Sequence, residues 1–361
     1  MTSVVLAGGG TAGHTSPLIA TAQALEAKGV EHIVAVGTAR GLEVRVIPEA
    51  GLDLELITPV PLPRKFGLDL LKLPFRLAKA IGESKQILRK QEADAVVGFG
   101  GYVSIPVYLA ARALKVPVFV HEANNIPGIA NKVGARKAAF VGTTFETQMP
   151  GNPKVVGMPV NRRITHPQVG TAQAREQFGL EPSRRTLLVS GGSQGAQAIN
   201  RAVLDARDAI LSEGIQILHV LGPKNFDDDP VVTHASGASY RPVAFVDDMA
   251  RAYAAADLMV GRAGAGTVME TAISGLPVIF IPLPWGNGEQ GKNASALVEA
   301  GGGVLLPESE LTSERLSAKV LELFDGEGTL ETMSQRAKAM YPDDAADVMA
   351  SAVLDVIRQR G

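Results

Sequence analysis

The chain has 361 residues, enough for two domains of ordinary size, and its 46% hydrophobic and 20% charged residues exclude a disordered tail. Lys and Arg number 35 against 37 Asp and Glu, so the net charge of −2 excludes a global basic surface for nucleic acid, and we expect no nucleic-acid partner. Cysteine is absent, which excludes disulfides, thiolate metal sites and a cysteine nucleophile.

Short apolar runs alternate with helical patterns along the whole chain. Apolar strands separated by helices are typical of parallel sheets covered on both faces, so the predicted fold class is doubly wound α/β. The first run, Val4–Ala7, is too short for a signal peptide, and no later stretch reaches the ~20 apolar residues that span a bilayer. In chain order, strands are predicted at Val4–Ala7, Ile33–Val36, Leu54–Ile57, Ala95–Val97, Val116–Val120, Ala139–Gly142, Thr186–Ser190, Gln216–Leu221, Arg241–Ala244, Leu258–Val260, Val278–Ile281 and Gly303–Leu306.

The pattern of the first residues starts again after Val160. A short helix, Ala172–Phe178, precedes a strong strand and a glycine-rich turn that mirror residues 1–13. We therefore predict two Rossmann-like, mononucleotide-binding domains of similar size that face each other across a cleft.

Glycine is the unusual component, with 39 residues where an average composition would give roughly 25. Glycine lets the backbone approach a ligand, and the helix after such a turn directs unpaired N–H groups and a partial positive charge at it. Tight turns also favour glycine without any ligand, but four of them together favour one that carries phosphate. The four turns are Gly8–Gly13, Gly98–Tyr102, Gly191–Ala196 and Gly261–Thr267.

Of two familiar nucleotide-binding motifs, one is incomplete in this sequence and the other is absent. Gly8, Gly10 and Gly13 match G-x-G-x-x-G, but the second strand ends Val36-Gly37-Thr38, without the acidic residue that would hold a nicotinamide cofactor's ribose. No turn continues into Gly-Lys-Ser/Thr, so the P-loop is excluded as well. We expect no cofactor.

Two histidines are candidates for a base. His14 follows the first turn at the start of a helix, where the dipole favours the neutral ring that a general base needs. A local bond to the backbone is the alternative role for it. His121 follows the strand ending at Val120, with Asn124 close behind. The six histidines lack metal-ligand spacing, so no metal site is expected.

Two acidic positions also bear on ligand binding. Glu270 lies one turn inside the helix opened by Gly264–Thr267, where it can accept hydrogen bonds from ribose hydroxyls. Asp227–Asp229 contains an Asp-x-Asp, which binds divalent ions in other sugar-nucleotide enzymes, but its turn-rich surroundings favour a solvated loop.

Residues 61–90 form a local basic and apolar stretch. It holds eight Lys and Arg against Asp69 and Glu83, a net charge of +6, with leucines and two phenylalanines between them. The composition fits an anionic membrane surface and, equally, a core helix with a solvated basic face.

These motifs together resemble the MurG family, bacterial transferases that add N-acetylglucosamine to lipid I on the cytoplasmic face of the membrane. The resemblance covers essentially the whole chain. Its motifs here are Gly9–His14, Gly98–Ser104, His121–Asn124, Gly157–Val160, Gly191–Ala196, Arg262–Glu270 and Gln290–Ala294.

The resemblance implies a two-domain GT-B fold and an inverting transfer to the 4-hydroxyl of lipid I that forms lipid II. It implies an N-terminal acceptor and membrane-associating domain over 1–160, a C-terminal UDP-sugar domain over 161–340, and a final helix within 341–361 that crosses back. It also implies peripheral attachment to the cytoplasmic face of the membrane through residues 62–79. The alternatives are another GT-B enzyme, such as a UDP-N-acetylglucosamine epimerase, and a non-catalytic sensor of nucleotide sugars.

The resemblance further implies roles for individual residues. His14 is the first choice for the base or for stabilising the leaving group, and His121 is the second. The sequence departs from the family at Ala12, where glycine is common, and at Asn161, where a donor-contacting arginine is usual, so Arg162 or Arg163 is expected to make that contact. The residues expected to bind donor or acceptor are Thr11, Ala12, Gly13, Tyr102, Asn124, Arg162, Arg163, Ser193, Gln194, Gly195, Val246, Ala265, Gly266, Thr267, Glu270 and Gln290.

Overall fold

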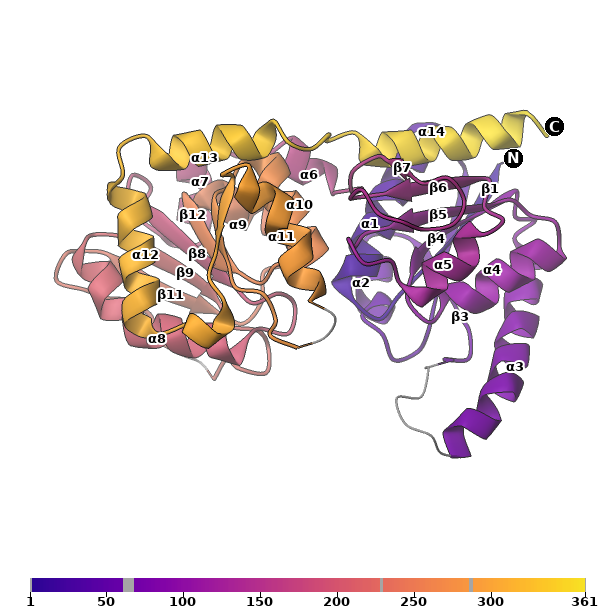
Figure 1. The fold of residues 1–361 in the computed structure, drawn as a ribbon, viewed down its shortest axis with the longest axis horizontal. Coiled ribbons are helices and arrows are strands. Elements are labelled where there is room, and N and C mark those ends of the chain that lie inside the picture. The colour runs from indigo at the N-terminus through magenta and orange to yellow at the C-terminus, as the bar shows by residue number, and fades with distance from the viewer. Residues whose placement is uncertain (1, 61–67, 228–229, 286–287, 361) are drawn as a thin grey trace. The chain divides into compact units, whose positions relative to one another are not determined.

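The computed structural model describes residues 2–60, 68–227, 230–285 and 288–360, with the side chains of 68–71 left out. The chain forms two compact units (Figure 1). Unit 1 joins Met1–Asn161 to the final segment Pro342–Gly361, and unit 2 is Arg162–Tyr341. Across the described ranges, every helix is too short or too polar to cross a membrane.

Unit 1 is built on a seven-stranded parallel sheet of order β3-β2-β1-β4-β5-β6-β7. Its strands are β1 (Ser3–Gly8), β2 (His32–Gly37), β3 (Asp53–Leu56), β4 (Ala95–Gly100), β5 (Val118–Glu122), β6 (Phe140–Thr143) and β7 (Lys154–Val155). Its helices are α1 (Ala12–Ala27), α2 (Glu43–Glu49), α3 (Leu68–Lys90), α4 (Ser104–Ala113), α5 (Ile129–Ala135) and α14 (Ala345–Arg358).

The central strand of unit 1 shows why both faces of the sheet are covered. Val4 and Leu6 of β1 enter one core cluster, whereas Val5 and Ala7 enter the other, because successive side chains point to opposite faces. Helices α1 and α14 contribute to the first cluster, and α3 and α4 contribute to the second. All residues of β1 are buried, as expected for a parallel strand covered on both faces.

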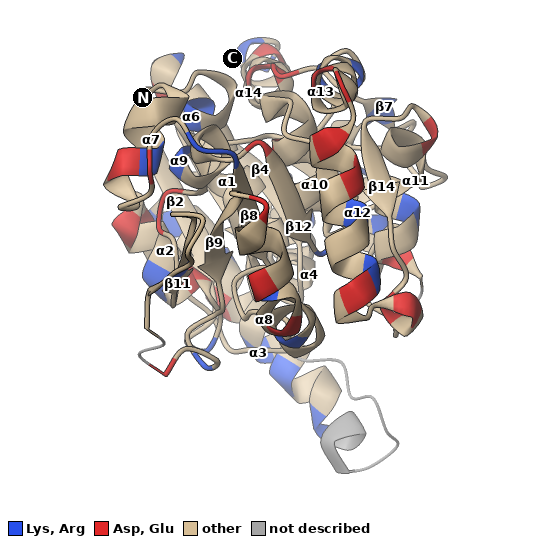
Figure 2. Cartoon of the chain, turned by 90° about the vertical axis from the view of Figure 1, so that its left-hand side faces the viewer, with Lys and Arg blue, Asp and Glu red and all other residues tan. Residues whose placement is uncertain are grey.

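Lys and Arg residues recur along the described part of helix α3, where they are blue in Figure 2. Leu73 and Leu77 pack against the core of unit 1, while Phe75 on the outer side is 79% exposed. Residues 62–67 of the predicted membrane-associating stretch, 62–79, lie outside the described residues.

Unit 2 repeats the topology, with the order β10-β11-β9-β8-β12-β13-β14, in which only the short β10 is antiparallel to its neighbour among the described strands. Its strands are β8 (Thr186–Ser190), β9 (Gln216–Val220), β10 (Val232–Thr233), β11 (Ser239–Val243), β12 (Leu258–Gly261), β13 (Val278–Phe280) and β14 (Gly303–Leu305). Its helices are α6 (Arg162–Thr165), α7 (Thr171–Gln177), α8 (Gln197–Ser212), α9 (Met249–Ala255), α10 (Ala265–Ser274), α11 (Glu289–Glu299), α12 (Ser313–Asp325) and α13 (Thr329–Lys338), with a 3₁₀ turn η1 (Glu308–Glu310).

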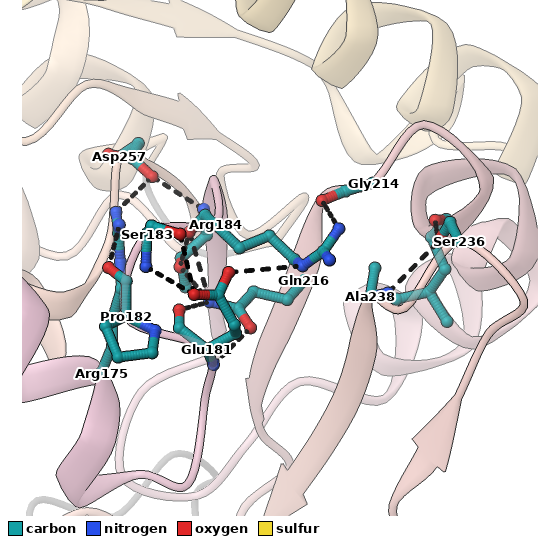
Figure 3. A network of polar contacts seen from close by, with 12 residues as sticks. Arg175, Glu181, Pro182, Ser183, Arg184, Gly214, Gln216, Ser236, Ala238 and Asp257 are labelled. Atoms are coloured by element: carbon teal, nitrogen blue, oxygen red, sulfur yellow. Dashed lines mark hydrogen bonds and ion pairs between the residues drawn. The ribbon is translucent and has the colours of Figure 1, made fainter.

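A polar network holds the amino ends of the central strands of unit 2 (Figure 3). Asp257 Oδ2 accepts hydrogen bonds of 2.7 Å from the Thr186 N–H and from the Arg175 guanidinium. Gln216, the first residue of β9, donates to the Glu181 carbonyl at 2.8 Å. This network lies at the end of the sheet opposite the glycine turns, so its role is to hold the strands together.

Candidate functional site

The four predicted glycine turns lie at the switch points of the two sheets. A switch point lies between two neighbouring strands whose following helices cover opposite faces of the sheet. In unit 1 the turns follow β1 and β4, which are neighbours whose next helices, α1 and α4, cover opposite faces. In unit 2 they follow β8 and β12, and α8 and α10 likewise cover opposite faces. Ligands of open α/β sheets bind at such points.

His14 lies in the first turn of α1, against the turn that precedes it. Its Nδ1 is 2.9 Å from the Gly9 carbonyl oxygen, which can only accept, so Nδ1 carries the proton and Nε2 keeps the lone pair. Burial lowers the pKa of His14, while the bond to Gly9 and the charges of Glu122 and Glu43 act against that shift. The ring is therefore neutral near pH 7, with an unprotonated Nε2.

The end of β4 packs against this ring, next to helix α5. A Cβ atom placed on Gly100 would lie 3.1 Å from His14 Nε2 and 3.2 Å from Asn131 Nδ2. Gly100 has φ of +99°, so its backbone also favours glycine. Ser104 binds the ends of both switch-point strands, donating to the Ala7 and Gly100 carbonyls at 3.0 and 2.7 Å.

The remaining unit 1 candidates lie at the same edge of the sheet. Thr11 is exposed and precedes α1, in which Ala12 and Gly13 are the first two residues. Tyr102 follows β4 and is 48% exposed. Asn124 follows β5, and its main-chain N–H donates to Glu122 Oε1 at 3.0 Å.

His121 occupies a different environment from the one its sequence position suggests. Strand β5 continues to Glu122, so His121 is a strand residue with a fully buried side chain that packs at 6.2 Å from the Phe99 ring. Its Nε2 donates to the Gly157 carbonyl at 2.9 Å, and burial lowers its pKa to about 4. A ring without exposed surface is poorly placed to reach a substrate.

Two buried carboxylates that sequence reasoning missed shape the turns of unit 1. Glu43 accepts the Gly10 N–H at 2.8 Å, and Glu122 accepts the Gly128 N–H at 2.9 Å and the Asn131 side chain at 3.0 Å. Glu43 accepts from Thr38 at the end of β2, where a dinucleotide fold carries its ribose-binding acid, whereas Glu122 lies at the end of β5. The fully buried Glu43 is already occupied by protein donors, which supports the rejection of a nicotinamide site.

In unit 2 the turn after β8 leads directly into α8. Ser193 is half-buried and Gln194 is exposed, and Gly195 adopts φ of +75°. Gly195 packs against the Leu221 carbonyl, and the Asn225 amide donates to the Gln194 carbonyl at 3.2 Å. These contacts hold the turn at the N-terminus of a 16-residue helix, which is a favourable place for a diphosphate.

The turn after β12 opens α10 with Ala265, Gly266 and Thr267, and Glu270 follows one turn later. Glu270 Oε2 accepts a hydrogen bond of 2.8 Å from the Tyr253 hydroxyl. Burial raises the pKa of Glu270 to about 7, although the Tyr253 bond opposes that change. Tyr253 was not predicted from the sequence, because it lies on α9, seventeen positions away.

The other unit 2 candidates lie on loops and helix starts. The Val246 side chain is buried between β11 and α9, and Gln290, near the start of α11, accepts the Leu283 N–H at 3.1 Å. Arg162 and Arg163 are exposed on α6, and Arg163 pairs with Asp248 at 3.3 Å.

Within the described ranges no cluster of three His, Cys, Asp or Glu side chains is placed to hold a metal ion. Of the Asp-x-Asp segment, Asp228 and Asp229 lie outside the described residues.

Comparison with known proteins connects this geometry to one family. Residues 4–143 match the glycosyltransferase family 28 N-terminal domain, and residues 186–349 match the C-terminal domain of that family. A Cutibacterium acnes protein named UDP-N-acetylglucosamine–N-acetylmuramyl-(pentapeptide) pyrophosphoryl-undecaprenol N-acetylglucosamine transferase is 54% identical, over 98% of this chain and 97% of its own. A Corynebacterium efficiens protein of the same name is 49% identical over 97% and 96%.

The chain belongs to the MurG family. The crystal structure of Acinetobacter baumannii MurG agrees, with a TM-score of 0.74 and 28% identity over 99% of this chain and 100% of that one. The two units are thus the two Rossmann-like domains of the GT-B fold. A putative UDP-N-acetylglucosamine 2-epimerase from Listeria monocytogenes has a TM-score of 0.65 at 14% identity over 99% and 97%, which shows a shared fold alone.

Proposed function

We propose that this protein transfers N-acetylglucosamine from UDP-N-acetylglucosamine to the 4-hydroxyl of lipid I, with inversion at the anomeric carbon, and so forms lipid II for peptidoglycan synthesis. The observation that carries the proposal is the 54% identity, over nearly the whole chain, to a relative named for this transfer. The switch-point turns of both units supply sites that suit its two substrates.

Unit 2 is the proposed donor domain. The Ser193–Gly195 turn and the N-terminus of α8 bind the diphosphate, and Glu270 accepts from the ribose hydroxyls. Gln290 binds the sugar hydroxyls and the main chain at Val246 the uracil. Ala265, Gly266 and Thr267 line the start of α10. Of the two arginines, Arg162 is the better candidate for the donor contact, since Arg163 pairs with Asp248.

Unit 1 is the proposed acceptor domain, with His14 as its base. His14 Nε2 takes the proton of the 4-hydroxyl, and the oxygen attacks the anomeric carbon as the bond to the diphosphate breaks. UDP leaves with that bond's electron pair, and the α8 dipole and the N–H groups of its turn stabilise the charge. The donor sugar and the acceptor are contacted by residues of the same edge of unit 1, namely Thr11, Ala12, Gly13, Tyr102 and Asn124.

Helix α3 supports attachment to the cytoplasmic face of the membrane. Phe75 is exposed between Lys72 and Lys79, which share its helix face because they are spaced by three and four residues. Each cation near an anionic surface contributes about 1 kcal/mol, and the aromatic ring can insert among the lipids.

The transfer is tested by measuring UDP release with and without a lipid I analogue. Release that depends on the acceptor, together with formation of the disaccharide, supports the proposal. Conversion of labelled donor in the absence of acceptor would show an epimerase, and binding without any turnover would show a sensor.

Membrane attachment is tested by co-sedimentation with vesicles rich in phosphatidylglycerol. Phe75→Ser should weaken vesicle binding without changing its salt dependence. Val155→Ser, at a site 58% exposed on β7 of the same unit, should leave vesicle binding unchanged. Equal loss in both variants would contradict a role for α3.

A further inference from the structure

Glu43 is a buried carboxylate with three protein donors and no surface for a ligand. It begins α2 and is 0% exposed. One oxygen accepts from the Thr38 N–H and hydroxyl at 2.9 and 3.0 Å, and the other accepts from the Gly10 N–H at 2.8 Å. Burying a carboxylate lowers stability unless donors compensate. A neutral side chain could make a purely structural contact at a lower cost in folding stability.

Three glycines make room for this carboxylate. A Cβ on Gly9 would lie 2.6 Å from Glu43 Oε1, one on Gly37 would lie 2.5 Å from its Cγ, and one on Gly41 would be closer still. The glycine turn after β1 is therefore shaped around a side chain of the protein at this point, and the Gly10 N–H points at Glu43 instead of a phosphate.

The Gly10 N–H and the Gly9 carbonyl belong to one peptide group, and its two ends have different partners. Glu43 holds the N–H, and the carbonyl oxygen accepts from His14 Nδ1 at 2.9 Å. The N–H and C=O of a trans peptide point in opposite directions, so fixing one end aims the other. A carboxylate, a peptide and an imidazole thus form one continuous chain of hydrogen bonds.

We propose that Glu43 is the positioning residue of the His14 base, acting through the Gly9–Gly10 peptide. The inference rests on the proposed function, because it deepens the role of His14 in the transfer. Glu43 polarises the peptide, which strengthens the carbonyl as an acceptor, holds the His14 proton on Nδ1 and leaves the Nε2 lone pair available. The arrangement acts as a carboxylate–histidine pair with a peptide inserted between its members.

The Gly9–Gly10 peptide lies between two glycines, so it needs a hydrogen-bond partner that fixes its orientation. Gly10 has φ of +89°, and a peptide between two glycines can rotate with little steric cost. A rotated peptide would present its N–H to His14 Nδ1, which would move the ring proton to Nε2 and remove the base. The Glu43 charge blocks this because a carboxylate can only accept.

The charged groups that face His14 are Glu43 from α2 and Glu122 from the end of β5, and both raise its pKa against the effect of burial. Replacing Glu43 with glutamine should therefore lower the pKa of His14 further. Glu122 is unchanged in that variant, so the shift reports on Glu43.

The test compares Glu43→Gln with Asp94→Asn by nitrogen NMR of labelled histidine and by steady-state kinetics. Asp94 is the control, because it also accepts a main-chain N–H, that of Ser3 at 2.9 Å, but at the end of the unit 1 sheet opposite the glycine turns. In Glu43→Gln we expect a lower His14 pKa, loss of the pure Nδ1–H form, and kcat reduced about tenfold or more with KM for the donor changed less than about twofold. Asp94→Asn should keep the wild-type values.

Two results would overturn the proposal. One is a folded Glu43→Gln protein with wild-type kcat and an unchanged His14 titration. The other needs no variant: a wild-type His14 that is neutral with its proton on Nε2. If wild-type protein releases no UDP with acceptor, the proposed function fails, while the NMR comparison still decides the link between Glu43 and His14.

Discussion

Burial lowers the pKa of three histidines, His14, His121 and His219, which differ in how much of the ring is accessible. His219 lies between the Tyr240 hydroxyl and the Asn200 amide, and burial lowers its pKa to about 3. His121 has no exposed surface, whereas His14 is half-buried at a switch point. Among these histidines, the candidate base is thus distinguished by the accessibility of its ring to a substrate rather than by its residue type.

His14 predicts the pH dependence of turnover. A base works when unprotonated, so the rate falls as pH drops through its pKa, and a pKa below the ordinary 6.5 moves that fall to lower pH. We expect the acidic limb of kcat/KM below pH 6.5. His14→Ala should lose that limb and reduce kcat by about 10²–10⁴-fold. A variant with nearly full turnover would remove His14 from the mechanism.

Glu270 predicts the pH dependence of donor binding. Its pKa of about 7 means that the side chain is protonated below neutrality, and a protonated carboxyl accepts ribose hydroxyls less well than a carboxylate. Donor affinity, measured by calorimetry, should therefore fall as pH drops through 7. Glu270→Gln should bind more weakly at pH 8 and show no such dependence. The same pH slope in that variant would assign the titration to another group.

Single residues also mark the limit of what the sequence reveals. His14 could be proposed from the sequence because it directly follows a glycine turn. Glu43 could not, because its contact to Gly10 spans 33 positions and no local pattern joins them. His121 was expected beyond the strand end, but two further residues of β5 turn its ring into the core.

At the scale of elements, the apolar runs predicted every strand of three residues or more in the described chain. They missed β7 and β10, because two residues are too few to show periodicity. Strand β4 extends to Gly100, beyond the predicted end at Val97, since its glycines break the apolar run but not the pairing. Three of the four glycine turns contain a glycine with positive φ, a conformation that favours this residue type, whereas the glycines of the turn after β12 have ordinary φ values.

The turn after β8 predicts a local effect on the donor. Gly195 and Gly214 both have φ of +75°, but they lie at opposite ends of the same sheet. Alanine at either should cost about 1–2 kcal/mol of unfolding free energy from the backbone alone. Only Gly195→Ala, which also meets the Leu221 carbonyl, should raise KM for the UDP-sugar. Comparable KM values in the two variants would separate this turn from donor binding.

At the scale of the whole molecule, unit 1 is made of two separated stretches of chain. Helix α14 packs on α1 and β6, and its Met349 and Val353 are fully buried in the unit 1 core. Burying each such side chain contributes about 1.5–3 kcal/mol, which is large beside a domain stability of ~5–15 kcal/mol. Unit 2 is one continuous segment.

This division predicts how fragments behave. Residues 162–341 should fold alone and melt cooperatively, because their two core clusters are drawn from that segment only. Residues 1–161 should aggregate or remain partly unfolded until a peptide spanning 342–361 is added. Circular dichroism with thermal melts will measure both fragments. A cooperative melt of 1–161 alone, at the temperature of the intact protein, would contradict the prediction.

The return of α14 to unit 1 has a consequence for synthesis on the ribosome. Domains generally fold in the order in which they emerge, from the N-terminus onward. Here unit 1, which starts to emerge before unit 2, cannot complete its core until residues 342–361 leave the exit tunnel, after unit 2 has emerged. Helix α3, which we propose attaches to the membrane, is thus exposed during translation on a unit that is still incomplete. On that proposal, a nascent chain can meet a lipid surface before it can act as a catalyst.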